Sequence, residues 1–363
     1  MKIGITGATG FIGYHTYTYL KYATDSEVIK LNRDFVNDKR LSECDWIIHL
    51  AGMNRGDDDE LYKTNIKLTS NLLDVKAFIV LFELIDNISE KTRVIFTSST
   101  QSNSIYADSK KVCEDMLLTS VDKHRILKLP NVFGPFGKPN YNSFVATFCY
   151  KLCNGESPKI IQDNNVELIF VTDVVKSFIT LMNYDYAPAL PTAKVKVSEI
   201  LQMLKGYKTQ YALEGKIPKL DTDFKKHLFN TFRSYMNHKD RLFSTTTHSD
   251  DRGELAELVN VDMSEGLVFT SFTNPNYVRG EHFHTRKFER FCVLDGEAVI
   301  RLRKMGSDEV IEYNVSGKDV KFIDMPIFYT HNIENIGKNQ MRAIFWVSEK
   351  YHEFDPDTFH EKV

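Results

Sequence analysis

The sequence lacks any long hydrophobic run, since no stretch approaches the roughly 20 apolar residues that a membrane-spanning helix requires. It also lacks an excess of basic residues: the formal net charge is −3, with 46 Lys and Arg against 49 Asp and Glu. A surface without a basic field is not expected to bind DNA or RNA. No signal peptide is evident, because glycines interrupt the apolar residues at the N-terminus. We therefore expect a cytoplasmic protein with neither a membrane nor a nucleic acid as its partner.

Cysteine is scarce, with 5 residues that show no regular spacing. An odd and irregular set does not form a disulfide framework, so a reducing compartment is expected. Cys149 and Cys153 are four residues apart, as neighbours on one helix would be. Because no second pair accompanies them, core packing explains them better than metal binding does.

The chain is long, with 363 residues, and its hydrophobic content of 42% is ordinary for a globular protein. That length exceeds what one hydrophobic core usually serves, so two domains are expected. In residues 1–185 short apolar runs alternate with helical patterns, which predicts an α/β domain with a Rossmann-type, doubly wound parallel sheet. The expected strands are 2–6, 27–32, 46–51, 93–99 and 125–130, and the expected helices are 11–23, 60–84 and 107–121.

The last third of the chain has a different rhythm. Short β-rich runs follow one another at roughly 8 to 12 residues with Gly or Asn-Pro turn signals, which predicts an all-β barrel or sandwich. Before them, 195–207 and 224–236 have the spacing of amphipathic helices that complete the first domain or link it onward. We expect domains at 1–240 and 241–363. The expected strands of the second are 266–273, 287–296, 297–305, 310–317, 320–326 and 342–350.

The first expected strand runs into a glycine-rich turn. Glycines spaced as Gly7, Gly10 and Gly13 let the chain turn sharply, let backbone N–H groups approach a pyrophosphate, and let the next helix pack close to the sheet. A position between a strand and a helix predicts a dinucleotide site rather than a plain strand-to-helix turn. The cofactor-binding residues expected in this turn are Gly7, Thr9, Gly10, Phe11, Ile12 and Gly13.

The end of the second expected strand bears on the choice of cofactor. An acidic residue there would hold the ribose 2′-hydroxyl of NAD, but Asn32 and Arg33 come first, with Asp34 behind them. Arginine suits the 2′-phosphate of NADP through charge-assisted hydrogen bonds. We therefore expect NADPH as the cofactor. The alternative is NAD, with Arg33 as a solvated surface residue.

Tyr106 and Lys110 follow a strand that ends in serines, with Ser99 upstream. When hydride reaches a carbonyl carbon, a proton must reach the oxygen, and a phenol can supply it if a lysine one helical turn away lowers its pKa. A serine hydroxyl can hold the carbonyl oxygen, and Thr100 could substitute for Ser99 in that task. The sequence therefore predicts a catalytic set of Ser99, Tyr106 and Lys110.

The spacing Tyr-x-x-x-Lys is weak evidence by itself, because it occurs twice more in this chain. Tyr17 and Lys21 show it, as do Tyr235 and Lys239. Neither pair follows a serine-bearing strand, so helix faces are the simplest interpretation of both.

These features resemble the extended short-chain dehydrogenase/reductase family of nucleotide-sugar enzymes, over about residues 1–240. The resemblance implies that Leu50, Ala51 and Gly52 bind the nicotinamide half of the cofactor. It also implies that Asn65 and Lys110 contact the cofactor and that Asn131 binds the sugar nucleotide. One departure is that Ser99 and Tyr106 are only seven residues apart, whereas many members have a longer loop there. The motifs that carry the resemblance are TGATGFIG (6–13), HLAG (49–52), Asn65, TSS (97–99), YADSK (106–110), LPNVFGP (129–135) and FVTDVV (170–175).

A second group of residues has the composition of a metal site. His282 and His284 are two apart, so on a strand they point to the same face. With Glu289 and His331 they make a ligand set for a divalent metal. Zinc is the usual occupant of sites rich in nitrogen ligands, while nickel, iron and manganese stay possible. The alternative is a set of ordinary barrel histidines.

The order of these residues, with Gly280, Gly296, Pro326 and Asn335 around them, resembles the cupin family of small β-barrels from about residue 241 onward. The stretch DDRGELAELV (250–259) also resembles the entry strand of deoxysugar 3,5-epimerases. Those enzymes use the same barrel, typically without the metal cluster.

A sugar-nucleotide reductase joined to such a barrel resembles the CapF-type family of capsular polysaccharide enzymes. The resemblance implies a UDP-linked 4-keto-6-deoxy amino sugar as the substrate and UDP-N-acetyl-L-fucosamine biosynthesis as the route. It implies epimerisation of C3 by the barrel and NADPH-dependent reduction of the C4 ketone by the other domain, in a homodimer. Two alternatives stay open: a reductase whose barrel serves only for metal-stabilised dimerisation, and a non-catalytic sugar-nucleotide sensor. Candidates for the epimerisation base are His331, Glu289 and Tyr329.

Overall fold

The computed structural model divides into two compact units, which are described one at a time. The first unit contains Met1–Phe133, Gly137–Phe144 and Asn164–Lys196. The second unit contains Gly134–Phe136, Val145–Asp163 and Val197–Val363.

The structure describes most of the chain, and within the described part no helix is both long and apolar enough to cross a membrane. The described residues are 1–32, 35, 38–86, 92–120, 124–244, 246–250, 253–257, 266–349 and 352–363.

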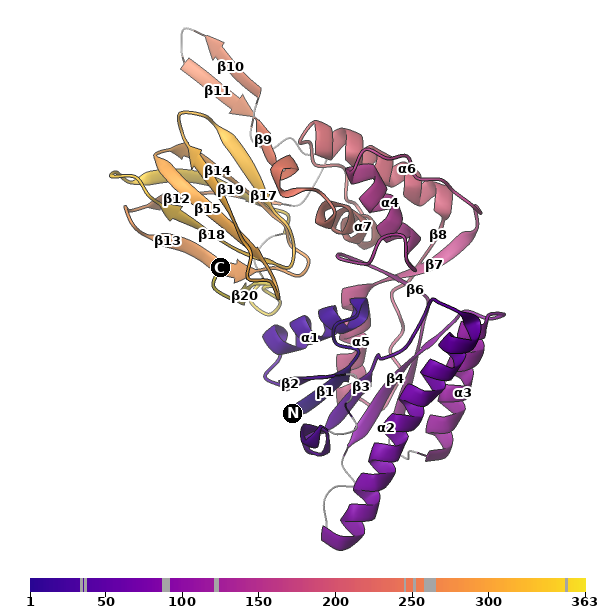
Figure 1. The fold of residues 1–363 in the computed structure, drawn as a ribbon. Helices are drawn as coiled ribbons and strands as arrows, with labels where there is room; N and C mark the ends of the chain where they lie inside the picture. Colours follow the sequence, from indigo (N-terminus) through magenta and orange to yellow (C-terminus); the bar gives the residue numbers. More distant parts are fainter. Residues whose placement is uncertain are drawn as a thin grey trace. The chain divides into compact units, whose positions relative to one another are not determined.

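The first unit is built on a parallel five-stranded sheet with the strand order β2-β1-β3-β4-β5 (Figure 1). Its central strands are continuous apolar runs, because helices cover both faces of the sheet. All five strands lie within a residue or two of where the sequence places them. They are β1 (Lys2–Thr6), β2 (Glu27–Leu31), β3 (Trp46–His49), β4 (Arg93–Ser99) and β5 (His124–Leu129).

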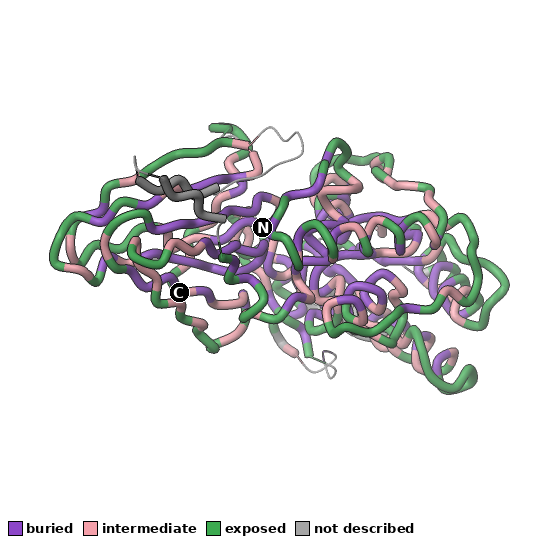
Figure 2. Tube along the Cα trace, turned by 90° about the horizontal axis from the view of Figure 1, so that it is seen from above, coloured by how far each residue is buried: buried purple, intermediate pink, exposed green. Residues whose placement is uncertain are grey.

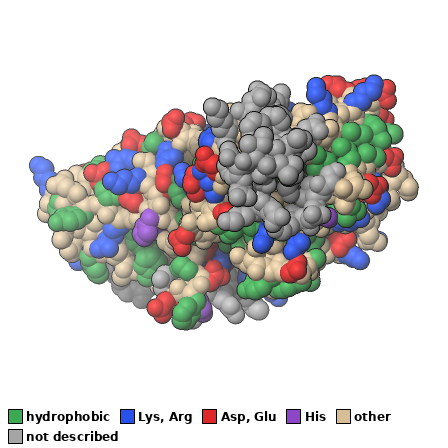
Figure 3. All heavy atoms as spheres, turned by 90° about the horizontal axis from the view of Figure 1, so that it is seen from below, with side chains coloured by type: hydrophobic (Ala, Val, Ile, Leu, Met, Phe, Trp, Pro, Cys, Tyr) green, Lys and Arg blue, Asp and Glu red, His purple; other side chains and the backbone are tan. Residues whose placement is uncertain are grey.

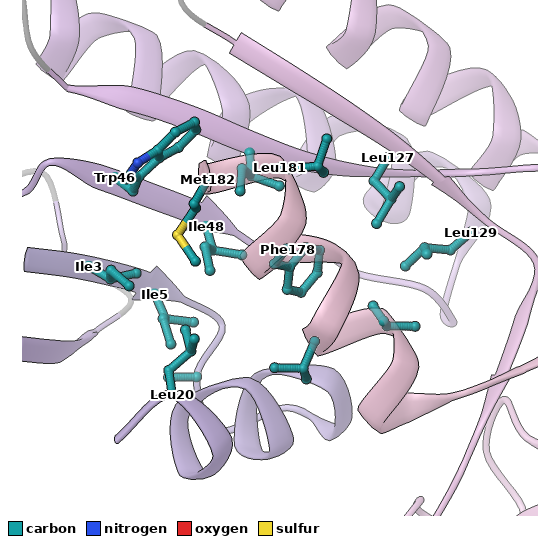
Figure 4. Packing of buried hydrophobic residues seen from close by; sticks show 14 of the residues in the cluster. Ile3, Ile5, Leu20, Trp46, Ile48, Leu127, Leu129, Phe178, Leu181 and Met182 are labelled. Atoms are coloured by element: carbon teal, nitrogen blue, oxygen red, sulfur yellow. The ribbon is translucent and has the colours of Figure 1, made fainter. Parts of the chain in front are cut away.

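Two apolar clusters lie on opposite faces of this sheet, because neighbouring strand residues point in opposite directions. Ile48 belongs to the cluster that Leu20 and Phe178 join from α1 and α5 (Figure 4). Its neighbour Ile47 belongs to the other cluster, which Leu117 joins from α3. The predicted doubly wound arrangement is therefore confirmed. The helices are α1 (Phe11–Ala23), α2 (Asp58–Asp86), α3 (Ile105–Ser120) and α5 (Val171–Asn183).

A small second sheet continues from the end of the parallel sheet. It has the order β6-β7-β8, with β6 parallel to β7 and β7 antiparallel to β8. These strands were not predicted, and runs as short as β6 and β8 carry no usable periodicity. They are β6 (Asn131–Phe133), β7 (Asn165–Phe170) and β8 (Ala193–Lys196).

The second unit contains two five-stranded antiparallel sheets, in the orders β12-β19-β14-β17-β9 and β16-β15-β18-β13-β20. Their inner faces form one apolar core, and Figure 2 shows buried and exposed stretches alternating along the chain. The predicted all-β region is confirmed, although β9, β10, β11, β13, β18 and β20 are not among the expected strands. The strands are β9 (Leu242–Ser244), β12 (Leu267–Thr273), β13 (Val278–Phe283), β14 (Glu289–Asp295), β15 (Glu297–Lys304), β16 (Val310–Ser316), β17 (Lys321–Met325), β18 (Tyr329–Asn335), β19 (Met341–Val347) and β20 (Phe359–His360), with a separate hairpin of β10 (Thr246–Asp250) and β11 (Gly253–Glu257).

Helices also belong to the second unit. Buried Asp324 on β17 accepts two hydrogen bonds from Arg290, at 2.8 and 3.1 Å, and a third from the hydroxyl of Tyr211. Arg233 of α7 donates to the Tyr211 hydroxyl at 2.9 Å, so helical residues before 240 share a buried polar network with the barrel. The domain boundary expected at residue 240 stays a prediction. The helical elements are α4 (Phe144–Cys153), α6 (Val197–Tyr207), η3 (Lys208–Leu213), α7 (Asp223–Ser234) and η4 (His238–Arg241).

One expectation about helix faces is wrong. Tyr17 and Lys21 do lie on one helix, α1. Tyr235, however, caps the C-terminus of α7 and Lys239 lies in the separate helix η4, so these two residues share no helix face.

All five cysteines are free thiols, and four of them are buried. Cys149 and Cys153 lie on α4, as their spacing predicts. Burial raises the pKa of Cys44 to about 11 and the pKa of both Cys153 and Cys292 to about 12.

The distribution of charged side chains on the surface is consistent with the small net charge. In the face that Figure 3 shows, acidic and basic side chains of the described residues are intermingled.

Candidate functional site

The turn between β1 and α1 is shaped by its glycines. Gly7 has φ +67°, and a Cβ atom there would lie 2.7 Å from the backbone nitrogen of Ala51. A Cβ atom on Gly13 would lie 2.1 Å from the carbonyl oxygen of Gly7. Larger residues are therefore excluded at both positions, and α1 can begin directly against the sheet edge.

The N-terminus of α1 is available to an anion. Its N-cap is Gly10, which has no side chain to cap the helix, and no acidic residue lies in the first turn. The backbone N–H groups at Phe11 and Ile12 therefore begin a helix dipole whose first turn carries no acidic side chain. Together with Thr9, these features fit the pyrophosphate of a dinucleotide.

The residues expected to select the cofactor are described only in part. Asn32 is exposed directly after β2. Arg33 and Asp34 lie outside the described residues, so the preference for NADP stays a prediction.

The loop after β3 is fixed by two side chains. Thr6 Oγ1 accepts hydrogen bonds from the backbone nitrogens of Leu50 and Ala51, both at 3.2 Å. Asn65 Oδ1 accepts from Met53 N at 2.6 Å, and its amide nitrogen donates to Met53 O at 2.8 Å. The predicted nicotinamide segment, Leu50 to Gly52, is thus held at both ends.

Asn65 also joins this loop to α3. Its Nδ2 donates to Ser109 Oγ at 3.0 Å, and Ser109 Oγ donates to the carbonyl oxygen of Tyr106 at 2.8 Å. A Cβ atom on Gly52 would lie 3.7 Å from Lys110 Nζ. The structure therefore brings together Gly52, Asn65 and Lys110, which the sequence assigns to one cofactor.

Tyr106 and Lys110 lie in the first turns of α3, as expected. Lys110 Nζ is buried, donates to Thr97 O at 3.0 Å and lies 5.9 Å from the centre of the Tyr106 ring. Burial lowers the pKa of Lys110 to about 8. Burial raises the pKa of Tyr106, so the expected lowering of that pKa is not present in this structure.

Ser99 ends β4 and is partly buried. Its hydroxyl oxygen accepts a hydrogen bond from Gln101 N at 3.0 Å. Thr100 is exposed, and its hydroxyl donates to Leu129 O at 3.4 Å. Ser99 is thus better placed than Thr100 beside α3, because the Thr100 hydroxyl is directed to the neighbouring strand.

Asn131 opens β6, and Gln101 Nε2 donates to its Oδ1 at 3.2 Å. Gln101 was not predicted as a site residue. It follows Ser99 by two residues, but nothing in that spacing indicates that its side chain orients Asn131.

The four predicted metal ligands meet in the second unit, where one ligand atom from each lies within 4.8 Å of the others. Glu289 Oε2 is 3.0 Å from His331 Nε2, 3.3 Å from His284 Nε2 and 3.9 Å from His282 Nε2. We call His282, His284, Glu289 and His331 the ligand cluster.

A β-bulge lies directly before the first of the two histidines, His282. The pairing of β13 with β18 shifts register between Gly280 and His282, with Glu281 at φ +59°. A Cβ atom on Gly280 would lie 2.7 Å from the carbonyl oxygen of His331. His282 pairs with His331, and His284 follows the last residue of the strand.

The electrostatics of the cluster are those of a buried carboxylate among three imidazoles. Burial would raise the pKa of Glu289, but hydrogen bonds from the three histidines outweigh it and hold that pKa well below its ordinary value. Burial lowers the pKa of His331. Burial also acts to lower the pKa of His284, but Glu289 and Asp357 raise it overall. His284 Nε2 is buried and lies 3.3 Å from Glu289 Oε2, as two ligand atoms of one metal would.

Asp357, near the C-terminus, holds the loop that carries His284, and no sequence signal pointed to it. Its carboxylate accepts from Thr285 N and Thr285 Oγ1 at 3.0 and 2.6 Å, and from the backbone nitrogens of Arg286 and Lys287 at 3.0 and 2.8 Å. His284 Nδ1 hydrogen-bonds to the Asp357 carbonyl oxygen. That bond leaves Nε2 of His284 directed toward the cluster.

The fold and these two sites define a Rossmann-type enzyme joined to an all-β unit with a metal-type cluster. The family models agree with both parts. Residues 3–189 match the NAD dependent epimerase/dehydratase family, and residues 248–359 match the polysaccharide biosynthesis C-terminal domain.

Similar proteins extend over the whole chain. A curated Pseudomonas aeruginosa protein, UDP-2-acetamido-2,6-beta-L-arabino-hexul-4-ose reductase, is 28% identical over 377 aligned residues, covering 99% of this chain and 98% of its own. The capsular polysaccharide assembling protein CapF from Staphylococcus aureus is 33% identical, with a TM-score of 0.61 and full coverage of both chains. A CapF structure with the inhibitor 3-isopropenyl-tropolone is 31% identical, with a TM-score of 0.55 and full coverage of both chains.

The chain belongs to the NAD dependent epimerase/dehydratase family and is a CapF-type capsular polysaccharide enzyme. Its cofactor class is accordingly a nicotinamide dinucleotide, which the turn at Gly7 to Gly13 fits.

Proposed function

We propose that this protein is a bifunctional nucleotide-sugar enzyme on the route to UDP-N-acetyl-L-fucosamine. The barrel epimerises C3 of a UDP-2-acetamido-2,6-dideoxy-4-hexulose, and the Rossmann unit then reduces the C4 ketone with NADPH. The observation that carries this proposal is the presence in one chain of the Tyr106–Lys110 turn and of the buried ligand cluster. Similarity over the full length of a hexul-4-ose reductase supports it.

One functional group of the substrate serves both reactions. A ketone at C4 acidifies the hydrogen on C3, so a base can remove that hydrogen and a proton can return from the other face. The same ketone is the acceptor in the reduction. NADPH supplies the hydride, Tyr106 the proton and Ser99 a hydrogen bond to the carbonyl oxygen.

Lys110 and Asn65 organise the reductase site in this proposal. Lys110 brings a positive charge beside Tyr106, while Asn65 ties the nicotinamide loop to α3 through Ser109. Gly7, Gly10 and Gly13 hold the pyrophosphate, and Arg33 contacts the 2′-phosphate. Asn131, oriented by Gln101, contacts the sugar nucleotide.

The ligand cluster would hold a divalent cation, most simply zinc, through three imidazoles and one carboxylate. Such a cation supplies Lewis acidity toward a carbonyl oxygen. The convergence of the three histidine Nε2 atoms on one oxygen of an ionised Glu289 supports this assignment.

Product analysis in D2O tests both activities at once. The substrate is generated from UDP-GlcNAc by a partner dehydratase, with NADPH present, and the products are examined by NMR. We expect deuterium at C3 and a hydroxyl group at C4. A C4 alcohol without deuterium at C3 would rule out the epimerisation, and an unreduced ketone would rule out the reductase.

A second function is favoured by the curated relative, whose printed name is that of a reductase alone. In that case the barrel is a metal-stabilised dimerisation module, and the isolated barrel shows no C3 exchange. Removing the metal would then dissociate a homodimer, measurable by analytical ultracentrifugation, while leaving reduction of an already epimerised ketone intact.

A further inference from the structure

The side chains that point into the barrel are apolar along most of its length and polar at one end. On β15 the side chains of Ala298, Ile300 and Leu302 point into the apolar core. Lys304 is next in this alternation, so it lies on the same inner face. Arg301 and Arg303 point outward, and both form ion pairs with glutamates of the surface.

The facing strand β18 shows the same change. Ile333 lies in the apolar core, and His331 and Tyr329 follow it toward one end on the same face. Leu302 pairs with His331, and Lys304 pairs with Tyr329. Cross-strand partners lie about 5 Å apart and successive inward residues about 7 Å apart, so Lys304 lies one layer beyond His331.

Glu289 brings the other sheet into this polar end, because its carboxylate lies 3.0 Å from His331. We define the polar end by four inward side chains, Glu289, Lys304, Tyr329 and His331. The core of this unit is therefore apolar through most of its length, with convergent polar groups gathered at one end, a combination that ligand sites commonly show.

Phe136 lies against the polar end. It belongs to the same compact unit and packs against the apolar core cluster. Lys304 Nζ lies 3.9 Å from the centre of its ring, and its ring centre is 6.3 Å from that of Tyr329. The ammonium of Lys304 is therefore partly withdrawn from water, which strengthens its interaction with any negative charge that comes close.

A second cation lies on the far side of the tyrosine. The guanidinium carbon of buried Arg241 is 5.1 Å from the centre of the Tyr329 ring, while its nitrogens donate to carbonyl oxygens of α7 and the residues after it. The guanidinium is thus fixed, and Arg241 and Lys304 place two positive charges beside Tyr329.

We propose that Lys304 binds the C4 carbonyl oxygen of the keto sugar in the barrel and stabilises the charge that this oxygen gains during epimerisation. The role rests on the proposed function. When the C3–H bond breaks, its electron pair forms a C3–C4 double bond and the carbonyl pair moves to oxygen, giving an enolate. The proton passes to a base and a proton returns to the opposite face, so the step needs no oxidant or reductant. Lys304 acts on the oxygen alone.

The test measures exchange of the C3 hydrogen of the UDP-4-keto sugar in D2O without NADPH, so that no reduction occurs. Lys304→Met should slow exchange by about 10²–10³-fold, mainly in kcat rather than KM, because the interaction is strongest with the developing oxyanion. Lys304→Arg should recover at least about tenfold over Lys304→Met, since the positive charge returns. Exchange by Lys304→Met within about threefold of wild type would overturn the proposal.

Two controls separate this role from others. Arg301→Met removes an outward cation of the same strand and should leave exchange unchanged. Phe136→Leu removes the ring that Lys304 contacts. An equal loss in Phe136→Leu and Lys304→Met would mean that Lys304 only holds this ring, and would overturn the proposal.

Further measurements show whether a loss of exchange comes from the loss of the Lys304 charge or from misfolding. Metal content and near-ultraviolet circular dichroism establish that each variant is folded, and Lys304→Gln carries the same prediction should Lys304→Met fail to fold. Exchange by wild type but not by Lys304→Met supports the role of Lys304. No exchange by wild type overturns the epimerisation together with the role of Lys304, whereas equal exchange by both proteins overturns only the latter.

Discussion

At the scale of single residues, motifs in the sequence account for most of the residues that we propose as ligand-binding in both sites. The glycine turn, Tyr106 with Lys110, and the cluster around His282 were all identifiable from spacing. Residues that support them were not, because their partners are remote. Asp357 acts on a loop 70 to 73 positions earlier, and Gln101 contacts Asn131 thirty positions later. Nothing local in a sequence encodes such pairs.

Tyr106→Phe removes the proton donor of the reductase. We expect NADPH oxidation on the UDP-4-keto sugar to fall by about 10²–10⁴-fold, the usual contribution of a positioned acid. Exchange at C3 should persist, because Tyr106 belongs to the first unit and the ligand cluster to the second. Loss of both activities would contradict the division of labour. Tyr17→Phe on α1 is the matched control.

Lys110→Met should stabilise the protein at neutral pH. Burial lowers the pKa of Lys110 from 10.5 to about 8, so the unfolded chain binds more protons between these values. Stability from this residue therefore increases as pH rises through that window. The variant should gain about 1–3 kcal/mol in the free energy of unfolding at pH 7, less as the pH approaches 10.

Urea unfolding at pH 7 and pH 9.5 measures that difference. The exposed neighbour Lys111, replaced by Met, should show no comparable pH dependence. A gain of equal size at both pH values would refute the attribution to a buried ammonium.

At the scale of elements, periodicity predicted the strands of the parallel sheet and most of the barrel. It missed short elements such as β6 and β20, whose existence depends on partners already in place. It also missed the bulge at Glu281, where one extra residue changes the direction of His282. A bulge leaves the composition of a strand unchanged, so alternation alone cannot show it.

The C-terminal segment that carries Asp357 is expected to control metal affinity. Asp357→Ala removes four hydrogen bonds from the loop after β13 and should weaken zinc binding by about 10–100-fold, the usual effect of losing a partner behind the ligands. A competition titration with a chromophoric chelator measures this affinity. Asp355→Ala breaks an exposed ion pair with Arg286 and should change it little. Equal effects of the two substitutions would refute a specific role for Asp357.

At the scale of the whole molecule, the boundary between the two halves was the hardest feature to predict. Sequence rhythm changes near residue 240, where the strands of the barrel begin. The buried network of Asp324, Arg290, Tyr211 and Arg233 includes residues on both sides of that point. Helical periodicity says which face of α7 is apolar but not which neighbour will cover it.

A fragment of residues 197–363 should therefore be more stable than a fragment of residues 241–363. The shorter fragment keeps Asp324 and Arg290 but lacks the Tyr211 hydroxyl and the Arg233 guanidinium that share their network. Removing partners from a buried ionic network typically costs about 3–5 kcal/mol. Thermal unfolding of the two fragments measures the difference. Equal midpoints would show that the barrel alone is the folding unit.

Because most of the cysteines are buried, the reactivity of their thiols can report local unfolding. Thiolates, not thiols, react with alkylating reagents, and burial disfavours the thiolate in Cys44, Cys153 and Cys292 alike. Cys44 and Cys113 belong to the first unit, while Cys149, Cys153 and Cys292 belong to the second. Pulsed alkylation followed by peptide mass spectrometry would thus show which unit opens first under denaturant, without any engineered label.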